Sequence, residues 1–267
     1  MEPCKEIKEL QAIDVHAHFG RFVRGESELV DNWRCGDGQK VVERARLAKT
    51  RLTVVSPLKS LLPRGEPDVR GGNAEAAREV ERVAGLAQWA VVDPREPKIY
   101  QQALAMLESP NCVGIKIHPE EHVYPIKERG GDIFEFAARH GLIVLSHSGQ
   151  ENSMPEDFVP FADEFPEVTL ILAHHGCTCD GDPSHQVRAI QAGKHGNIFT
   201  DTSSSSNINP GQIEFAVREV GAEKVLYGTD SPLYFAPMHR VRIELAEISD
   251  EAKRLILHDN AAGLLGL

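Results

Sequence analysis

Five clusters of polar residues contain the side chains that could do chemistry, and each follows a short apolar run. They cover residues 14–18 (DVHAH), 116–119 (KIHP), 146–148 (SHS), 174–176 (HHG) and 228–232 (GTDSP). Imidazole nitrogens and carboxylate oxygens are common ligands of zinc and other divalent transition metals. The clusters therefore indicate a metal centre, provided that the fold brings them together.

The histidine pair at positions 16 and 18 has the spacing of a chelate. Side chains alternate along a strand, so His16 and His18 point to the same side. His147 and His174 end later apolar runs, and Asp230 ends the last one. One histidine at a strand end is more often a structural residue, but this whole set would be costly to bury without a ligand. We therefore predict that all five residues bind the metal.

The elements that must position these residues are eight short apolar runs, each followed by a helix-like stretch. Strands are expected at 12–16, 52–56, 87–93, 113–118, 142–147, 168–174, 197–201 and 224–229. Such alternation predicts βαβ units and a parallel sheet. In a (β/α)8 barrel the carboxyl ends of the strands meet on one face, where active sites form. Closure of the barrel would bring Asp230 next to His16 and His18.

An open, doubly wound sheet is the main alternative to this barrel. It also alternates strands and helices, but no G-x-G-x-x-G motif follows the first strand. Eight evenly spaced units in 267 residues favour closure. No linker or shift in composition is visible, so residues 1–267 are interpreted as a single (β/α)8 TIM barrel domain.

Charge and cysteine content restrict the partners and the compartment. The chain has 40 acidic and 29 basic residues, a net charge of −11, which argues against nucleic acid and anionic membrane partners. The first residues are charged where a signal peptide needs an apolar stretch, and no apolar run is long enough to span a bilayer. Five scattered cysteines argue against a disulfide framework. We expect a cytoplasmic protein with a small-molecule substrate, and a homo-oligomer is left open.

The motifs resemble, in order, those of the amidohydrolase superfamily. They are DVHAHFG, GIKIHP, LIVLSHSG, LILAHHG, DTSS, LYGTDSP and the ending HDNAAGLLGL. The resemblance is strongest to the amidohydrolase-related branch that includes aminocarboxymuconate semialdehyde decarboxylase. It implies a (β/α)8 barrel with a catalytic divalent metal. It does not fix the reaction, because the branch contains hydrolases, lactonases and non-oxidative decarboxylases.

The resemblance also implies roles for single residues. His16 and His18 match the paired ligands of the first strand, and His147 and His174 match the histidines of the fifth and sixth strands. Asp230 matches the aspartate of the eighth strand, which binds metal, shuttles a proton, or does both.

Lys116 is the ambiguous member of the predicted site. It shares a strand face with His118, and some members of the superfamily carry a carbamylated lysine there that bridges two metals. The alternative is a free amine that contacts a substrate carboxylate or a neighbouring acid. We expect the free amine and one ion rather than two, because one metal needs no bridge. Zinc is expected, with manganese or another divalent ion left open.

The expected reaction is hydrolysis of a small, carboxylated amide, cyclic amide or lactone by a metal-activated water. Asp230 would move the proton, and His174 or His118 would stabilise the oxyanion. Two alternatives remain. One is non-oxidative decarboxylation of a small carboxylated substrate at the same metal, with Asp230 managing a proton. The other is a barrel that binds a ligand without turnover, against which the complete ligand set argues.

Loop residues give weaker signals. Residues 203–206, all serines, and Asn207 could bind anionic oxygens or form a plain polar loop. Arg21, Arg24 and Trp33 could form a lid, and Asp201 could orient a ligand or bond within the barrel.

Overall fold

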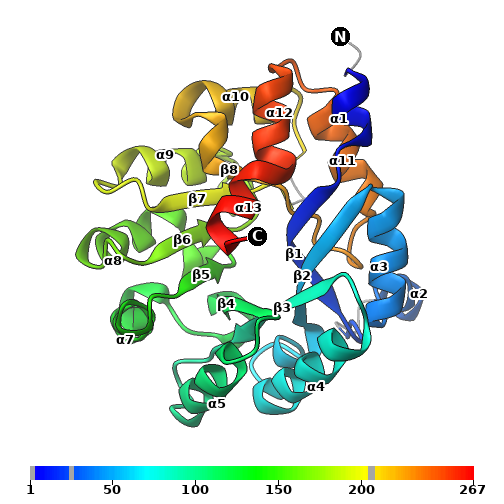
Figure 1. Ribbon diagram of the computed structural model, residues 1–267. Helices are drawn as coiled ribbons and strands as arrows, with labels where there is room; N and C mark the ends of the chain where they lie inside the picture. Colours follow the sequence, from blue (N-terminus) through cyan, green and yellow to red (C-terminus); the bar gives the residue numbers. More distant parts are fainter. Residues whose placement is uncertain (1–3, 24–26, 204–207) are drawn as a thin grey trace.

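The fold is that of a barrel of parallel strands surrounded by helices (Figure 1). The computed structural model describes residues 4–23, 27–203 and 208–267. Its eight strands pair in chain order, each parallel to the next. They are β1 (Ala12–Phe19), β2 (Thr50–Pro57), β3 (Leu86–Val91), β4 (Cys112–Ile117), β5 (Ile143–Ser146), β6 (Thr169–Leu172), β7 (Ile198–Asp201) and β8 (Val225–Leu226).

Backbone hydrogen bonds close the barrel between β1 and the chain at the end of β8. The Val15 amide donates to the Tyr227 carbonyl at 2.9 Å, and the His18 amide donates to the Ser231 carbonyl at 2.6 Å. The Thr229 amide donates to the His16 carbonyl at 3.1 Å. The prediction of a (β/α)8 barrel is confirmed, and the open sheet is excluded because its edge strands would not be joined.

The strand boundaries differ from the predicted ones mainly at the carboxyl ends. β8 has two residues, where a strand over 224–229 was expected, and β6 ends two residues before His174. His174 and Asp230 have φ angles of 67° and 55°, which take the chain out of the extended conformation. Left-handed backbone is uncommon for residues other than glycine and is concentrated at functional sites.

The helices surround the strands, except that α13 lies across one end of the barrel (Figure 1). They are α1 (Lys5–Glu9), α2 (Glu28–Trp33), α3 (Gly38–Leu47), α4 (Val69–Arg82), α5 (Lys98–Leu107), α6 (Pro119–His122), α7 (Ile126–His140), α8 (Val159–Glu164), α9 (His185–Ala192), α10 (Gln212–Val220), α11 (Ala236–Glu244), α12 (Asp250–Arg254) and α13 (Asn260–Leu265). Short 3-10 turns cover Leu58–Ser60, Glu151–Ser153, Pro155–Phe158 and Ala222–Lys224, and a π-helical turn covers Leu255–Asp259.

Side-chain caps begin several of these helices. Asp37 accepts from the Lys40 amide at the start of α3, and Asp68 accepts from the Gly71 amide at the start of α4. Gly141, with φ of 60°, ends α7. In the described part of the chain, no helix combines the length and apolar character needed to cross a bilayer.

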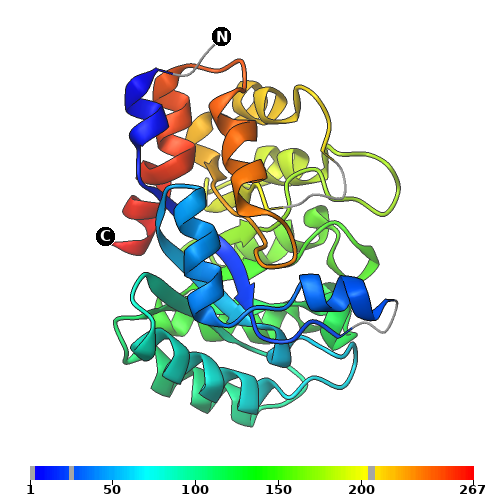
Figure 2. The ribbon, with the colours of Figure 1, turned by 90° about the vertical axis from the view of Figure 1, so that its right-hand side faces the viewer.

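A hydrophobic cluster lies between the strands and α13. Ile13 and Trp89 are fully buried there, and Ala261 of α13 packs with them. In Figure 2, α13 (red, left) and the segment with α2 (blue, right) lie at opposite ends of the molecule. Because packed side chains close one end of the barrel, the polar residues gather at the other end.

Candidate metal centre

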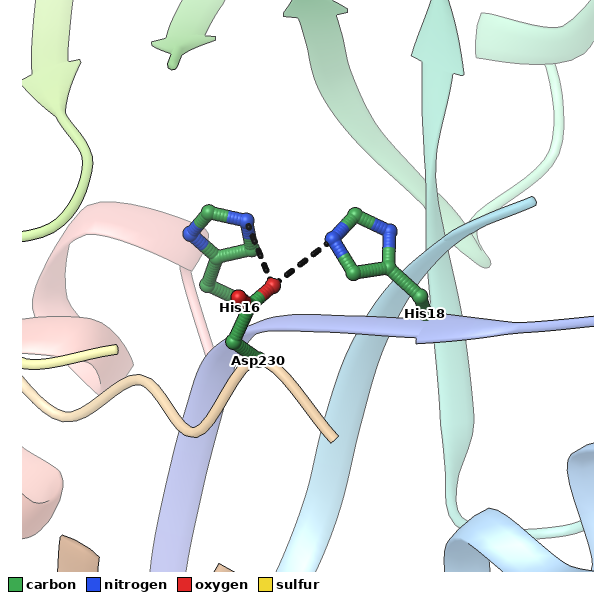
Figure 3. Close-up of side chains that lie close together, drawn as sticks. All are labelled: His16, His18 and Asp230. Carbon is green, nitrogen blue, oxygen red and sulfur yellow. Dashed lines mark ion pairs between the residues drawn. The ribbon is translucent and has the colours of Figure 1, made fainter. Parts of the chain in front are cut away.

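Two histidines of β1 and the aspartate that follows β8 converge at the carboxyl end of the barrel. His18 Nε2 lies 2.9 Å from Asp230 Oδ1, and His16 Nε2 lies 3.7 Å from the same oxygen. Figure 3 shows the two imidazoles and the carboxylate pointing toward one another. All three side chains are buried, and their ligand atoms lie close enough together to hold one ion. As the sequence predicts, His16 and His18 point to the same side of β1, and closure of the barrel brings Asp230 next to them.

The left-handed backbone at Asp230 aims its carboxylate at the histidines. The Asp230 amide donates to the His16 carbonyl at 2.7 Å, and the Leu233 amide donates to the Asp230 carbonyl at 3.0 Å. These bonds hold the turn in a conformation that a non-glycine residue adopts only when its surroundings enforce it. The carboxylate is thereby fixed before any ligand binds.

The Nδ1 atoms of His16 and His18 already have hydrogen-bond partners. His16 Nδ1 lies 2.9 Å from Asp201 Oδ2, and His18 Nδ1 lies 3.1 Å from the Ser56 carbonyl oxygen. A histidine that binds metal usually donates its other ring N–H to a carboxylate or carbonyl. Both Nε2 atoms therefore face the site, His16 Nε2 at 3.1 Å from Lys116 Nζ and His18 Nε2 at 2.9 Å from Asp230 Oδ1, and an ion beside Asp230 would replace these contacts.

His147 supplies an independent sign that these residues fit a metal. Its Nε2 bonds to Gln150 Oε1 at 2.7 Å, while its buried Nδ1 has no hydrogen-bond partner within the described residues. A buried polar atom without a partner is costly and calls for an explanation such as an ion. The donor set of imidazoles and a carboxylate suits a divalent cation.

The five predicted ligands are not equally close to one another. His16, His18 and Asp230 form the compact group, whereas His174 packs on His16 with ring centroids 4.7 Å apart. His147 lies one step further away, 4.9 Å from the ring of His174. The assignment of His147 and His174 as ligands therefore stays a prediction.

Burial and neighbouring charges set the protonation states in this cluster. Burial, together with Lys116, lowers the pKa of His16 to about 4. Burial, together with His16, lowers the pKa of His174 to about 3. Burial alone would raise the pKa of Asp230, but the hydrogen bond from His18 and the nearby histidines hold it well below its usual range. A cation binds to neutral imidazoles and to an ionised carboxylate, so these protonation states suit a metal site.

Lys116 lies inside the barrel beside His16, His18 and Asp230, which together are called the metal group below. It is fully buried, its Nζ lies 3.1 Å from His16 Nε2, and burial lowers its pKa to about 8. The sequence predicts this position on β4, but whether the amine is modified stays a prediction.

We expect one divalent ion per chain and an unmodified Lys116. A carbamate there would add a negative charge beside the buried carboxylates Asp201 and Asp230, which is unfavourable without a second cation. Native mass spectrometry at neutral pH, combined with metal analysis, measures both quantities. The control is protein stripped of metal in bicarbonate-free buffer. Two ions per chain and the added mass of a carboxyl group would contradict the expectation.

A cavity of about 240 Å³ opens above the metal group. Its polar lining residues include His18, His118, His147, His174 and Asp230. Its apolar lining residues include Phe22, Leu58, Leu61, Leu62 and Leu233. His118 stacks on His147 with ring centroids 4.2 Å apart, so it also faces this cavity. The cavity can hold a small molecule with a polar end and an apolar body.

Arg34 also lines the cavity, and the sequence did not single it out. Its guanidinium carbon lies 5.2 Å from the ring centroid of Phe22 and 5.8 Å from that of Tyr234. Within the described ranges it forms no ion pair with an acidic side chain. This cation is therefore available to a bound anion.

Of the residues predicted as a lid, Arg21 and Trp33 do not line this cavity. Arg21 lines a separate surface hollow, Trp33 is exposed, and Arg24 lies outside the described residues. No spacing distinguishes Arg34 from these neighbours, so the sequence held no signal for it. Among the serines after β7, Ser203 is buried and bonds to His174, whereas residues 204–207 lie outside the described part.

Comparison with known proteins identifies the family. The model of the amidohydrolase family matches residues 13–267. No curated protein sequence matches the chain significantly. Among solved structures, 5-carboxyvanillate decarboxylase from Sphingomonas paucimobilis has a TM-score of 0.75 at 14% identity, covering 97% of this chain and 99% of that one.

Two further structures have the same fold. A putative amidohydrolase from Staphylococcus aureus has a TM-score of 0.71 at 15% identity, covering 97% of this chain and 100% of that one. 2,6-Dihydroxybenzoate decarboxylase from Rhizobium has a TM-score of 0.75 at 11% identity, covering 96% and 98%. At these identities the likeness concerns the fold, whereas the family match spans nearly the whole sequence. The chain therefore belongs to the amidohydrolase family.

Proposed function

We propose that the protein is a metal-dependent non-oxidative decarboxylase of a small, carboxylated, planar substrate. The observation that carries this proposal is the composition of the cavity, which joins the histidine–aspartate group to an apolar wall and to Arg34. An apolar wall beside a carboxylate favours its loss, because the charge disperses as neutral CO2 leaves. Several solved structures with this fold are decarboxylases of aromatic acids, which supports this reading over the hydrolysis first expected.

Five residues, His16, His18, His147, His174 and Asp230, would hold the ion. When bound, a divalent ion supplies positive charge to substrate oxygens. Zinc was expected from the sequence. Manganese is bound in the decarboxylases of this fold from Polaromonas and Novosphingobium aromaticivorans, so both metals need testing.

Asp230 would manage the proton of the reaction. The bond between the carboxylate carbon and its neighbour breaks, CO2 leaves, and the electron pair stays on the neighbouring carbon, which must gain a proton. The Asp230 carboxylate, ionised at neutral pH, takes a proton from a substrate hydroxyl or from water and passes it to this carbon.

His118 would act as a hydrogen-bond donor to the substrate. Its Nδ1 accepts the Glu121 amide at 3.3 Å, and burial holds its pKa well below the usual value. A neutral imidazole with an accepting Nδ1 carries its proton on Nε2. This tautomer donates to a substrate oxygen and is not a base at Nε2.

The test of the proposed function is a comparison of two substrate panels. Protein loaded separately with zinc and manganese is incubated with hydroxylated aromatic carboxylates and with lactones and cyclic amides. Release of CO2 from the first panel is expected. Hydrolysis of the second panel, without CO2 release from the first, would overturn the proposal in favour of hydrolysis.

We expect Arg34→Ala to raise KM by roughly 10- to 100-fold, because a charge-assisted hydrogen bond to an anion contributes about 1.5–3 kcal/mol. Bound metal should not change, since Arg34 lines the cavity but is not one of the five predicted ligands. Arg34→Lys should be intermediate, because it keeps the charge but loses the planar fork. Steady-state kinetics and metal analysis measure both effects. Arg21→Ala is the matched control, and an equal rise in KM there would argue against Arg34 as the anion contact.

A further inference from the structure

A hydrogen-bonded group lies behind the metal ligands, at the end of β7. The hydroxyl of Ser203 lies 2.7 Å from His174 Nδ1 and 3.1 Å from His16 Nδ1, and it bonds to Asp201 Oδ1. The other oxygen of Asp201 lies 2.9 Å from His16 Nδ1. All four side chains are buried. The group joins β1, the turn after β6 and the end of β7.

We propose that Ser203 and Asp201 are positioning residues that set the tautomers of His174 and His16, so that both rings present an unprotonated Nε2 to the metal site. The inference rests on the proposed function only through the location of that site.

The protons of this group can be assigned from its backbone donors. Asp201 Oδ1 accepts the amide of His174 at 3.1 Å and the amide of Ser203 at 2.9 Å, and amides only donate. Asp201 therefore acts as an acceptor throughout.

The Ser203 hydroxyl then has one arrangement that satisfies every partner. Its single hydrogen goes to Asp201, so its oxygen can only accept from His174. His174 must therefore carry its proton on Nδ1. His16 likewise donates from Nδ1 to Asp201 Oδ2. A neutral imidazole has one N–H, so Nε2 of both rings keeps its lone pair, which in His16 faces Lys116 Nζ at 3.1 Å.

The same group explains why a second ion is not expected. His16, His174 and Asp201 have ligand atoms close enough to hold a metal. The Ser203 oxygen, however, lies within hydrogen-bond distance of all three side chains, and both Nδ1 atoms are used as donors. The hydroxyl takes the place that a second ion would need, which leaves the Nε2 side as the metal side.

The decisive variant is Ser203→Ala, which removes the acceptor from His174 and leaves Asp201 in place. Thr200→Val is the matched control, because the Thr200 hydroxyl is also buried at the end of β7 but donates to the Leu172 carbonyl at 2.8 Å. Ser203→Thr restores a hydroxyl and tests rescue. Thermal unfolding of each metal-free variant shows that it folds.

The first readout is the histidine tautomers of the metal-free protein, taken from long-range nitrogen–proton NMR spectra. His174 should show an Nδ1–H form in the parent, the Thr200→Val control and Ser203→Thr, and a mixture or an Nε2–H form in Ser203→Ala. The second readout is metal affinity by chelator competition. Loss of a partner behind a ligand typically weakens affinity by about 10- to 100-fold, and Ser203→Ala should fall in this range.

An unchanged tautomer of His174 in Ser203→Ala would overturn the inference. If the folded Ser203→Thr variant failed to recover metal affinity and the parent tautomer, the role of the hydroxyl would also be refuted. Neither readout needs turnover. If no carboxylate is decarboxylated but the tautomer shifts, the proposed function fails while this inference stands.

Discussion

Asp230→Asn should retain most of its metal while losing about 10²-fold or more in kcat, the usual scale for a general acid–base group. Asparagine keeps the shape of the side chain and one oxygen that can lie where Asp230 Oδ1 contacts His18 Nε2 at 2.9 Å. Its amide cannot accept a proton from the substrate and return it to carbon. The change therefore separates proton transfer from metal binding.

The measurement is kcat and metal content on the same preparation. Asp93→Asn is the matched control, because Asp93 is also a buried aspartate that follows a strand, but it pairs with Arg95 at 2.7 Å and does not line the cavity. It should leave kcat near the parent value. If Asp230→Asn binds metal and turns over at the parent rate, Asp230 is not the proton carrier.

The base would then have to be another residue of the cavity. His118 is a poor candidate, because its Nδ1 accepts the Glu121 amide and its Nε2 carries the proton. If His174 does not bind the ion, it is the better second candidate, because its Nδ1 lies 2.7 Å from the Ser203 hydroxyl, which would leave Nε2 unprotonated and able to accept a proton.

Regular backbone geometry explains which parts of the fold and site could be predicted. Strand alternation places His16 and His18 on one side, and barrel closure brings Asp230 to them. Both inferences need only the period of a strand and the order of the strands. The length of β8 could not be predicted, because the left-handed turn at Asp230 depends on contacts with β1.

The positions of loop residues were harder to predict, because no regular side-chain period governs them as it does in a strand or helix. Arg34 reaches the cavity through packing against Phe22 and Tyr234, which are distant from each other in sequence. Ser203 was grouped with an anion-binding loop, yet it is buried against His174. A signal for it did exist: Asp201 and Ser203 have the same two-residue spacing at a strand end as His16 and His18.

His16→Ala should abolish turnover and lower the affinity for divalent metal by more than the roughly 10- to 100-fold that loss of an outer-shell partner costs. The imidazole of His16 is one of the three side chains in the compact group. It also links Asp201, at 2.9 Å from Nδ1, to Lys116, at 3.1 Å from Nε2. Its removal therefore takes away a ligand and leaves two buried charged groups without this partner.

The fold should survive this change. Leaving a buried polar group unsatisfied costs about 1–3 kcal/mol, which lowers the melting temperature without removing the cooperative transition. The packed layers around Ile13 and Trp89 lie at the opposite end of the barrel and are untouched. Circular dichroism during heating, together with metal analysis, distinguishes loss of the site from loss of the fold.

His175→Ala is the matched control for this variant. His175 is also buried and lies next to His174, but its Nε2 is 3.0 Å from the Gln212 carbonyl, toward α10 and away from the metal group. Its removal should lower stability by a similar amount while the bound metal stays at the parent level. Equal metal loss in both variants would mean that destabilisation alone empties the site. Unchanged metal content in His16→Ala would remove His16 from the centre and, with it, the chelating pair on β1.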